Sequence, residues 1–163
     1  MSNVTKENME DVSSYMTAIW NNFDNGSTSL EHYADVMTAL GAATASSTKE
    51  IAAGLEKFAA IGKTIGLSYE YATSAVATIV DKTRQSADTV GTGLRTIFSR
   101  LQGLSLGETL EDGVDLNKYS TALKTVGVNI LDASGNMKDM DAILDSLAGK
   151  WKNLSNAQKT ALA

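Results

Sequence analysis

Residues 47–66, STKEIAAGLEKFAAIGKTIG, carry the clearest helical signal in the chain. Ser47 and Glu50 stand three residues apart just before an apolar series, which is the signature of a capping box at a helix N-terminus. The apolar residues that follow are spaced three or four apart, as on one face of an amphipathic helix: Ile51, Leu55, Phe58, Ile61 and Ile65. Gly66 then closes the helix. The pattern predicts one helix over residues 48–65, and its apolar face should be the most buried in the chain.

The same spacing recurs on both sides of this stretch. Upstream, Thr28 and Glu31 have the pattern of a second capping box after the breaker Asn25-Gly26. Downstream, Ser68 is the next candidate N-cap. The apolar stripes include Met9, Leu30, Ile97 and Trp151 among their members. Helices are expected over residues 9–23, 28–40, 48–65, 68–83, 86–104, 115–126, 139–151 and 155–163.

One segment departs from helical periodicity. Residues 128–131 alternate between apolar and polar side chains, and residues 132–136 are dense in turn-forming residues. This pattern predicts a small β-hairpin near residues 127–138. The chain contains no proline, which favours uninterrupted helices elsewhere. The fold class is therefore expected to be all-α, a multi-helix bundle of short amphipathic helices with that one small hairpin.

The distribution of apolar, acidic and glycine residues also predicts the domain organisation. Residues 1–4 are expected to be a disordered leader or a remnant of cloning, and residues 5–104 a helical core region. Residues 105–115 carry glycines and carboxylates and are interpreted as an exposed connector. Residues 116–163 are expected to form a helical C-terminal part with the hairpin. Because the last expected helix stops without a C-cap, the chain is interpreted as cut from a longer protein.

Composition excludes several classes of function. The 163 residues fit one domain, or one domain and a small subdomain. The absence of cysteine excludes disulfides, thiolate metal sites and cysteine nucleophiles. The net charge of −5 argues against a dedicated nucleic-acid surface. Ala, Ser, Thr and Gly make up 67 of the 163 residues, so the helices can approach closely but bury little apolar area each. Such a thin core favours dependence on a partner or on further copies.

No residue is assigned a catalytic, cofactor-binding or metal-binding role. His32 is the single histidine, and its sequence neighbours Glu31 and Asp35 supply no nucleophile. A structural or solvent-exposed histidine is the favoured interpretation. No histidine pair exists at the spacing of a zinc site, and no cysteine is present. The chain is expected to be no enzyme and to need no cofactor.

Three weaker motifs are also set aside. Residues 132–141 superficially suggest a calcium loop, but Met137 and Ile143 stand where an EF-hand requires Gly and Glu, so a turn is the stronger interpretation. The triplet at residues 62–64 resembles the end of a phosphate-binding loop but lies inside a helical stripe. Gly62 and Gly66, with small-xxx-small spacing, indicate close packing or helix ends.

Basic residues gather in one part of the sequence: Lys82, Arg84, Arg95 and Arg100. Four charges give a weak phosphate footprint. A solvated face balanced by Asp81 and Asp88 is favoured over a surface next to DNA. No specific nucleic-acid binding is expected.

The order of several short motifs resembles the core region of tail tape measure proteins from long-tailed phages and prophages. The first set is Gly66-Leu67-Ser68-Tyr69-Glu70, Thr83-Arg84-Gln85-Ser86-Ala87-Asp88-Thr89-Val90-Gly91 and Leu94-Arg95-Thr96-Ile97-Phe98-Ser99-Arg100-Leu101. The second set is Leu123-Lys124, Val126-Gly127-Val128, Asp132-Ala133-Ser134-Gly135-Asn136-Met137, Ile143-Leu144, Leu154-Ser155 and Gln158-Lys159. The resemblance covers about residues 10–163. Tape measure proteins are far longer, so the resemblance implies a fragment.

The resemblance implies a structural role in the virion. Such proteins occupy the tail lumen, set the length of the tube during assembly in the host cytoplasm, and leave the tube when DNA is ejected. The implied partners are other copies of the chain, tail tube and tail assembly proteins, and the host envelope on ejection. A second hypothesis stays open at this point, a non-enzymatic helical protein-binding or adaptor module unrelated to phage tails.

Overall fold

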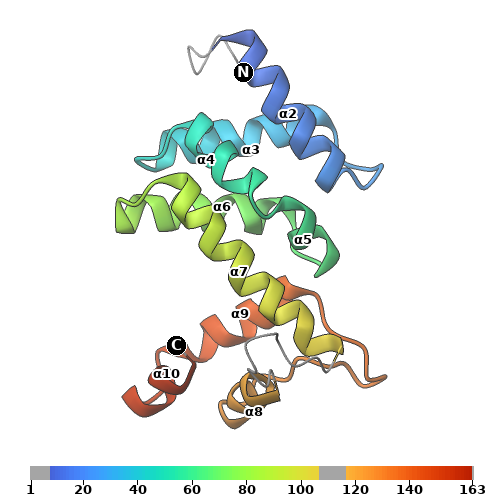
Figure 1. Cartoon of the computed structure of the whole chain (residues 1–163), viewed down its shortest axis with the longest axis vertical. Helices are drawn as coiled ribbons and strands as arrows, with labels where there is room; N and C mark the ends of the chain where they lie inside the picture. The colour runs from blue at the N-terminus through green and yellow to red at the C-terminus, as the bar shows by residue number, and fades with distance from the viewer. Residues whose placement is uncertain (1–7, 107–116, 163) are drawn as a thin grey trace. The chain divides into compact units, whose positions relative to one another are not determined.

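The computed structural model describes residues 8–106 and 117–162, and its regular elements are helices (Figure 1). In chain order these are α2 (Met9–Phe23), α3 (Leu30–Ala43), α4 (Thr48–Glu56), α5 (Ala59–Thr64), α6 (Tyr69–Thr83), α7 (Ala87–Leu106), α8 (Asn117–Thr125), α9 (Met140–Trp151) and α10 (Asn156–Leu162). The predicted all-α class, a bundle of short helices, is confirmed.

The chain divides into two compact units, Met1–Thr96 and Ile97–Ala163, and the boundary falls within α7. In the first unit, α4 packs against both α2 and α6 (Figure 1). Helix α3 packs against α2, α4 and α6, so these four helices enclose the core. In the second unit, α8 packs against α10.

Part of the expected domain organisation lies outside the described residues. This holds for the leader, residues 1–4, and for residues 107–115 of the acidic connector. The division into a core region over residues 5–104 and a C-terminal part over residues 116–163 therefore stays a prediction.

Aromatic side chains fix the centre of the first unit. The rings of Tyr33 and Tyr69 meet edge to face, with centroids 4.6 Å apart, and both side chains are buried. The Tyr69 hydroxyl donates a hydrogen bond to the carbonyl oxygen of Tyr33 at 2.7 Å. The Tyr33 hydroxyl donates in turn to the carbonyl oxygen of Phe23 at 2.8 Å. Because both hydroxyls have acceptors, the tyrosines contribute their apolar area without leaving an unpaired polar group.

Two glycines bring the backbones of α4 and α7 into direct contact. A Cβ atom placed on Gly91 would lie 2.3 Å from the carbonyl oxygen of Gly54. A Cβ atom on Gly54 would lie 2.7 Å from Cγ1 of Val76 and 3.1 Å from the carbonyl oxygen of Ala87. Only residues without a side chain fit at this crossing, because any Cβ atom would push the helices apart.

The expected single helix over residues 48–65 is wrong, since the structure has α4 and α5 in its place. The break is at Phe58, whose N–H donates to the carbonyl oxygen of Leu55, three residues back rather than four. The backbone of Phe58 has φ −131° and ψ 2°, and its side chain is buried. Ile51, Leu55 and Ile65 are buried as expected, whereas Ile61 is half-buried. The tightened turn keeps Phe58 in the core although the helix is interrupted.

The N-caps were predicted correctly at some helices and wrongly at another. Ser47 and Glu50 form the expected capping box of α4. Ser68 caps α6 through a bond from the Tyr71 N–H. The capping box expected at Thr28 is wrong, because the N-cap of α3 is Ser29, which accepts from the His32 N–H at 3.2 Å. The N–H of Thr28 donates instead to the side chain of Asn25, in the turn before the helix.

The buried face of α7 also differs from the expected stripe. Val90 and Leu94 are buried as expected. Ile97 is 52% exposed, whereas its neighbour Phe98 is 3% exposed. The buried positions of α7 are therefore spaced four apart, at Val90, Leu94 and Phe98, so Phe98 takes the buried place expected for Ile97.

The expected hairpin near residues 127–138 is reduced to one antiparallel bridge between Leu131 and Met137. The predicted turn is present: Gly135 has φ +84°, and the Asp132 carboxylate accepts bonds from the N–H groups of Ser134 and Asn136. Two backbone hydrogen bonds join the arms, from Asp132 N–H to the Asn136 carbonyl and from Lys138 N–H to the Ile130 carbonyl. Within the described residues no β-strand is formed.

The capping box of α4 gives a first testable expectation. Ser47→Ala removes the hydroxyl that accepts from the Glu50 N–H at 3.2 Å, and should lower the free energy of unfolding by about 1 kcal/mol. Urea denaturation at neutral pH measures this change. An unchanged midpoint would contradict a stabilising cap.

The same box makes stability depend on pH. Hydrogen bonds from the Ser47 N–H and hydroxyl hold the pKa of Glu50 below its ordinary value of 4.5. Its stabilising contribution is therefore complete above that value and is lost as the pH falls through the lower folded-state pKa. Glu50→Gln keeps an acceptor at this position but does not titrate, so its unfolding free energy should fall less than that of the parent between about pH 5 and pH 3. Equal losses in the two proteins would contradict the coupling.

Candidate functional site

His32 lies on the surface of α3 and pairs with α6, not with its neighbours in the sequence. Its Nε2 atom is 2.5 Å from Oε1 of Glu70. Both side chains are about half exposed. A histidine hydrogen-bonded to a carboxylate is two-thirds of a catalytic triad, but such a triad also needs a nucleophile oriented by the histidine. The nearby Tyr33 hydroxyl is buried and donates to a backbone carbonyl, and the His32–Glu70 contact links α3 to α6.

The described residues offer no metal centre. In residues 8–106 and 117–162, no group of three or more His, Asp or Glu side chains could hold a metal ion.

Burial raises the pKa of Tyr69 and keeps its hydroxyl protonated. No helix in the described part of the chain is long and apolar enough to cross a membrane.

Two of the basic residues, Lys82 and Arg84, lie beside the carboxylate of Asp81. Lys82 Nζ lies 3.0 Å from Asp81, and Arg84 lies 4.0 Å from the same carboxylate. The contact with Lys82 is the main cause that lowers the pKa of Asp81. Asp88, expected to balance this group, pairs instead with Lys57 at 2.9 Å. The favoured interpretation of a charge-balanced face therefore holds around Asp81, with a different partner for Asp88.

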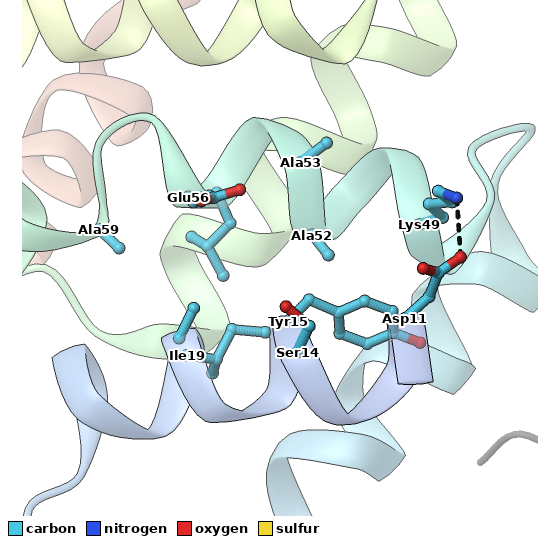
Figure 2. A pocket seen from close by; sticks show the side chains of 11 residues that line it. Asp11, Ser14, Tyr15, Ile19, Lys49, Ala52, Ala53, Glu56 and Ala59 are labelled. Atoms are coloured by element: carbon cyan, nitrogen blue, oxygen red, sulfur yellow. Dashed lines mark hydrogen bonds and ion pairs between the residues drawn. The ribbon is translucent and has the colours of Figure 1, made fainter. Parts of the chain in front are cut away.

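A small pocket of about 180 Å³ lies between α2 and α4 (Figure 2). Its floor consists of small side chains from α4, including Ala52 and Ala53. Figure 2 shows Tyr15 and Ile19 of α2 facing them, with the ion pair between Lys49 Nζ and Asp11 Oδ2 at one end, 2.9 Å apart. The ion pair ties α2 to α4 across the pocket. The pocket is thus a narrow gap between two packed helices, because the small alanine side chains of α4 allow α2 to lie close to it.

A larger apolar groove runs between α2 and α3 and has a volume of about 620 Å³. We call it the Met9 groove, and its main lining residues are Met9, Val12, Met16, Trp20, Leu30 and Glu31. Ser13 and Thr17 add hydroxyl groups to the lining, and Glu31 supplies its negative charge. Met9 and Leu30 are 76% and 49% exposed, an unusual state for large apolar side chains on packed helices.

The second groove lies within the second unit and has a volume of about 430 Å³. We call it the Trp151 groove, and its main lining residues are Ile97, Arg100, Leu101, Leu144, Leu147 and Trp151. Arg100 supplies its positive charge. Lys159 Nζ lies 5.9 Å from the centre of the Trp151 ring, so a second cation stands at the groove.

Sequence reasoning missed both grooves for one reason. Met9, Leu30, Ile97 and Trp151 belong to apolar stripes, which predict a core face, yet in the structure these four are the exposed large apolar side chains among the described residues. The helices have the predicted apolar faces, but these four side chains are left exposed on them. Exposed apolar helix faces of this kind are typical of surfaces that bind another protein.

The comparison with known families covers the entire sequence. Residues 1–163 match the profile of a family described as phage-related minor tail protein. The match therefore includes both units and both grooves. No solved structure matches the chain.

Proposed function

Because the chain belongs to the phage-related minor tail protein family, with a structural role in the tail of the virion, we propose that it is a segment of a tape measure protein. In this role the protein occupies the tail lumen, sets the length of the tube during assembly in the host cytoplasm, and leaves the tube when DNA is ejected. The observation that carries the proposal is the family match over the whole chain, joined to the order of motifs that resembles the tape measure core region. Family membership overturns the alternative of an adaptor unrelated to phage tails.

The chemistry of the described surface supports an assembly role. The Met9 groove and the Trp151 groove are apolar, and each carries one charged lining residue, Glu31 or Arg100. The His32–Glu70 pair joins two helices of the first unit across the surface. We therefore propose a non-enzymatic protein whose partners are other copies of itself, tail tube and tail assembly proteins, and the host envelope at ejection.

The helical architecture also fits a tail component that must pass through a narrow tube. Most of the described helices have 15 residues or fewer, and the chain divides into two compact units. Short helices with small side chains bury little apolar area, so the folded units are expected to open at modest cost. A protein that is packed during assembly and released at ejection benefits from such low stability.

The test is to locate the chain in the phage that encodes it. Antibodies against residues 8–106 would be applied to purified particles before and after DNA ejection. Mass spectrometry would measure how much of the chain the intact and the emptied particles contain. The expected result is that intact particles contain the chain shielded from antibody, and that emptied particles have lost it. Its absence from intact particles would contradict a tail role, and its retention after ejection would contradict a tape measure role.

A further inference from the structure

The exposed large apolar side chains of the described residues fall in pairs. Met9 and Leu30 both line the Met9 groove, and Ile97 and Trp151 both line the Trp151 groove. Isolated exposed apolar residues need no explanation, but pairs gathered in a groove indicate a surface that a partner covers. Each groove also continues the apolar stripe of a helix that is buried elsewhere along its length.

The two grooves carry opposite charges. The charged residue among the described residues that line the Met9 groove is Glu31, in the first turn of α3. The one that lines the Trp151 groove is Arg100, and Lys159 stands over the Trp151 ring. A groove that docked on its own counterpart in a second copy would bring two like charges into one interface, two Glu31 carboxylates or two Arg100 guanidinium groups. Such juxtaposed like charges oppose binding when they are removed from water.

From this complementarity we infer that the Met9 groove of one copy docks on the Trp151 groove of a second copy. Met9 and Leu30 are then covered by Ile97 and Trp151, and Glu31 meets Arg100. The contact joins two different surfaces, so each copy has one groove left for a further neighbour, and association can continue into a row of copies. The inference deepens the proposed function, on which it rests, by naming the surfaces through which copies meet in the tail.

Charge reversal tests the pairing in the full chain. The variants are Glu31→Arg and Arg100→Glu, with Arg95→Glu as the matched control, since Arg95 is an exposed residue of α7 that does not line the groove. Sedimentation velocity over a range of concentrations measures association, and circular dichroism confirms that each variant keeps its helices. Each reversal in a groove should weaken association at least about tenfold, and the control should change it less than about threefold.

Mixing the two groove variants identifies which grooves meet. In an equimolar mixture, the arginine introduced by Glu31→Arg faces the glutamate introduced by Arg100→Glu, and the unchanged Glu31 and Arg100 still face each other. Association should therefore return to near the parental level in the mixture although each variant alone is weak. Recovery supports the inference. A parent chain that stays monomeric, association that neither reversal weakens, or a mixture that does not recover would each overturn it.

These outcomes are separate from those of the proposed function. A chain that is found inside intact tails but does not associate through these grooves keeps its tail role and refutes the docking. A chain that associates as described but is absent from particles refutes the tail role and leaves the contact between copies standing.

Discussion

Gly91→Ala is expected to lower the free energy of unfolding by about 3 kcal/mol, at the upper end of the range for overpacked sites. The added Cβ atom would lie 2.3 Å from the carbonyl oxygen of Gly54 and 3.0 Å from its Cα atom. Both neighbours are backbone atoms of α4, so no side-chain rotation can relieve the contact. The helices have to separate, and the core next to Val76 opens with them. Urea denaturation followed by circular dichroism measures the change.

Gly93→Ala is the matched control on the same helix. No atom lies within 4 Å of a Cβ placed on Gly93. Replacing an exposed glycine inside a helix by alanine should stabilise the protein by about 0.5–1 kcal/mol. The two variants, only two residues apart, should therefore shift stability in opposite directions. If both variants stabilise the protein, α4 and α7 do not cross at Gly54 and Gly91.

Phe58→Ala is expected to cost about 3–5 kcal/mol, the usual cost of truncating a buried aromatic side chain. Phe58 is 1% exposed and lies between α4 and α5. Because small single domains have a total stability of about 5–15 kcal/mol, this loss could unfold a large fraction of the molecules.

Met9→Ala serves as the control for this truncation. Met9 is 76% exposed, so its removal should change the unfolding free energy by less than about 0.5 kcal/mol. The same denaturant series measures both variants. A shift below about 1 kcal/mol for Phe58→Ala would mean that Phe58 lies outside the core.

Local chemistry made the helix starts predictable from sequence. Ser47 with Glu50, and Ser155 with Gln158, each satisfy one another's N–H groups within four residues, so the signal is contained in the sequence itself. The turn at Gly135 is likewise set by its neighbours. The wrong cap at Thr28 shows the limit, because the choice of Ser29 depends on the Asn25 side chain accepting from the Thr28 N–H.

Features that depend on distant residues were not predictable. The pair His32–Glu70 spans 38 positions, and nothing near His32 in the sequence indicates its partner. The contact of Gly54 with Gly91 requires knowing how α4 and α7 cross. Apolar spacing identifies the stripe of a helix but not which part of the stripe another helix will cover. The Met9 groove and the Trp151 groove lie where a part of an apolar stripe is left uncovered, which the spacing alone does not indicate.

We propose that this chain contributes length to a phage tail, and a measurement of tail length tests this role most directly. Phage particles in which the 163 codons are duplicated in frame would be compared with the parent by electron microscopy. An α-helix rises about 1.5 Å per residue, so the duplication should lengthen tails by up to about 240 Å. A shift of the whole length distribution is the expected result. Particles with tails of unchanged length, carrying the duplicated protein, would contradict the claim.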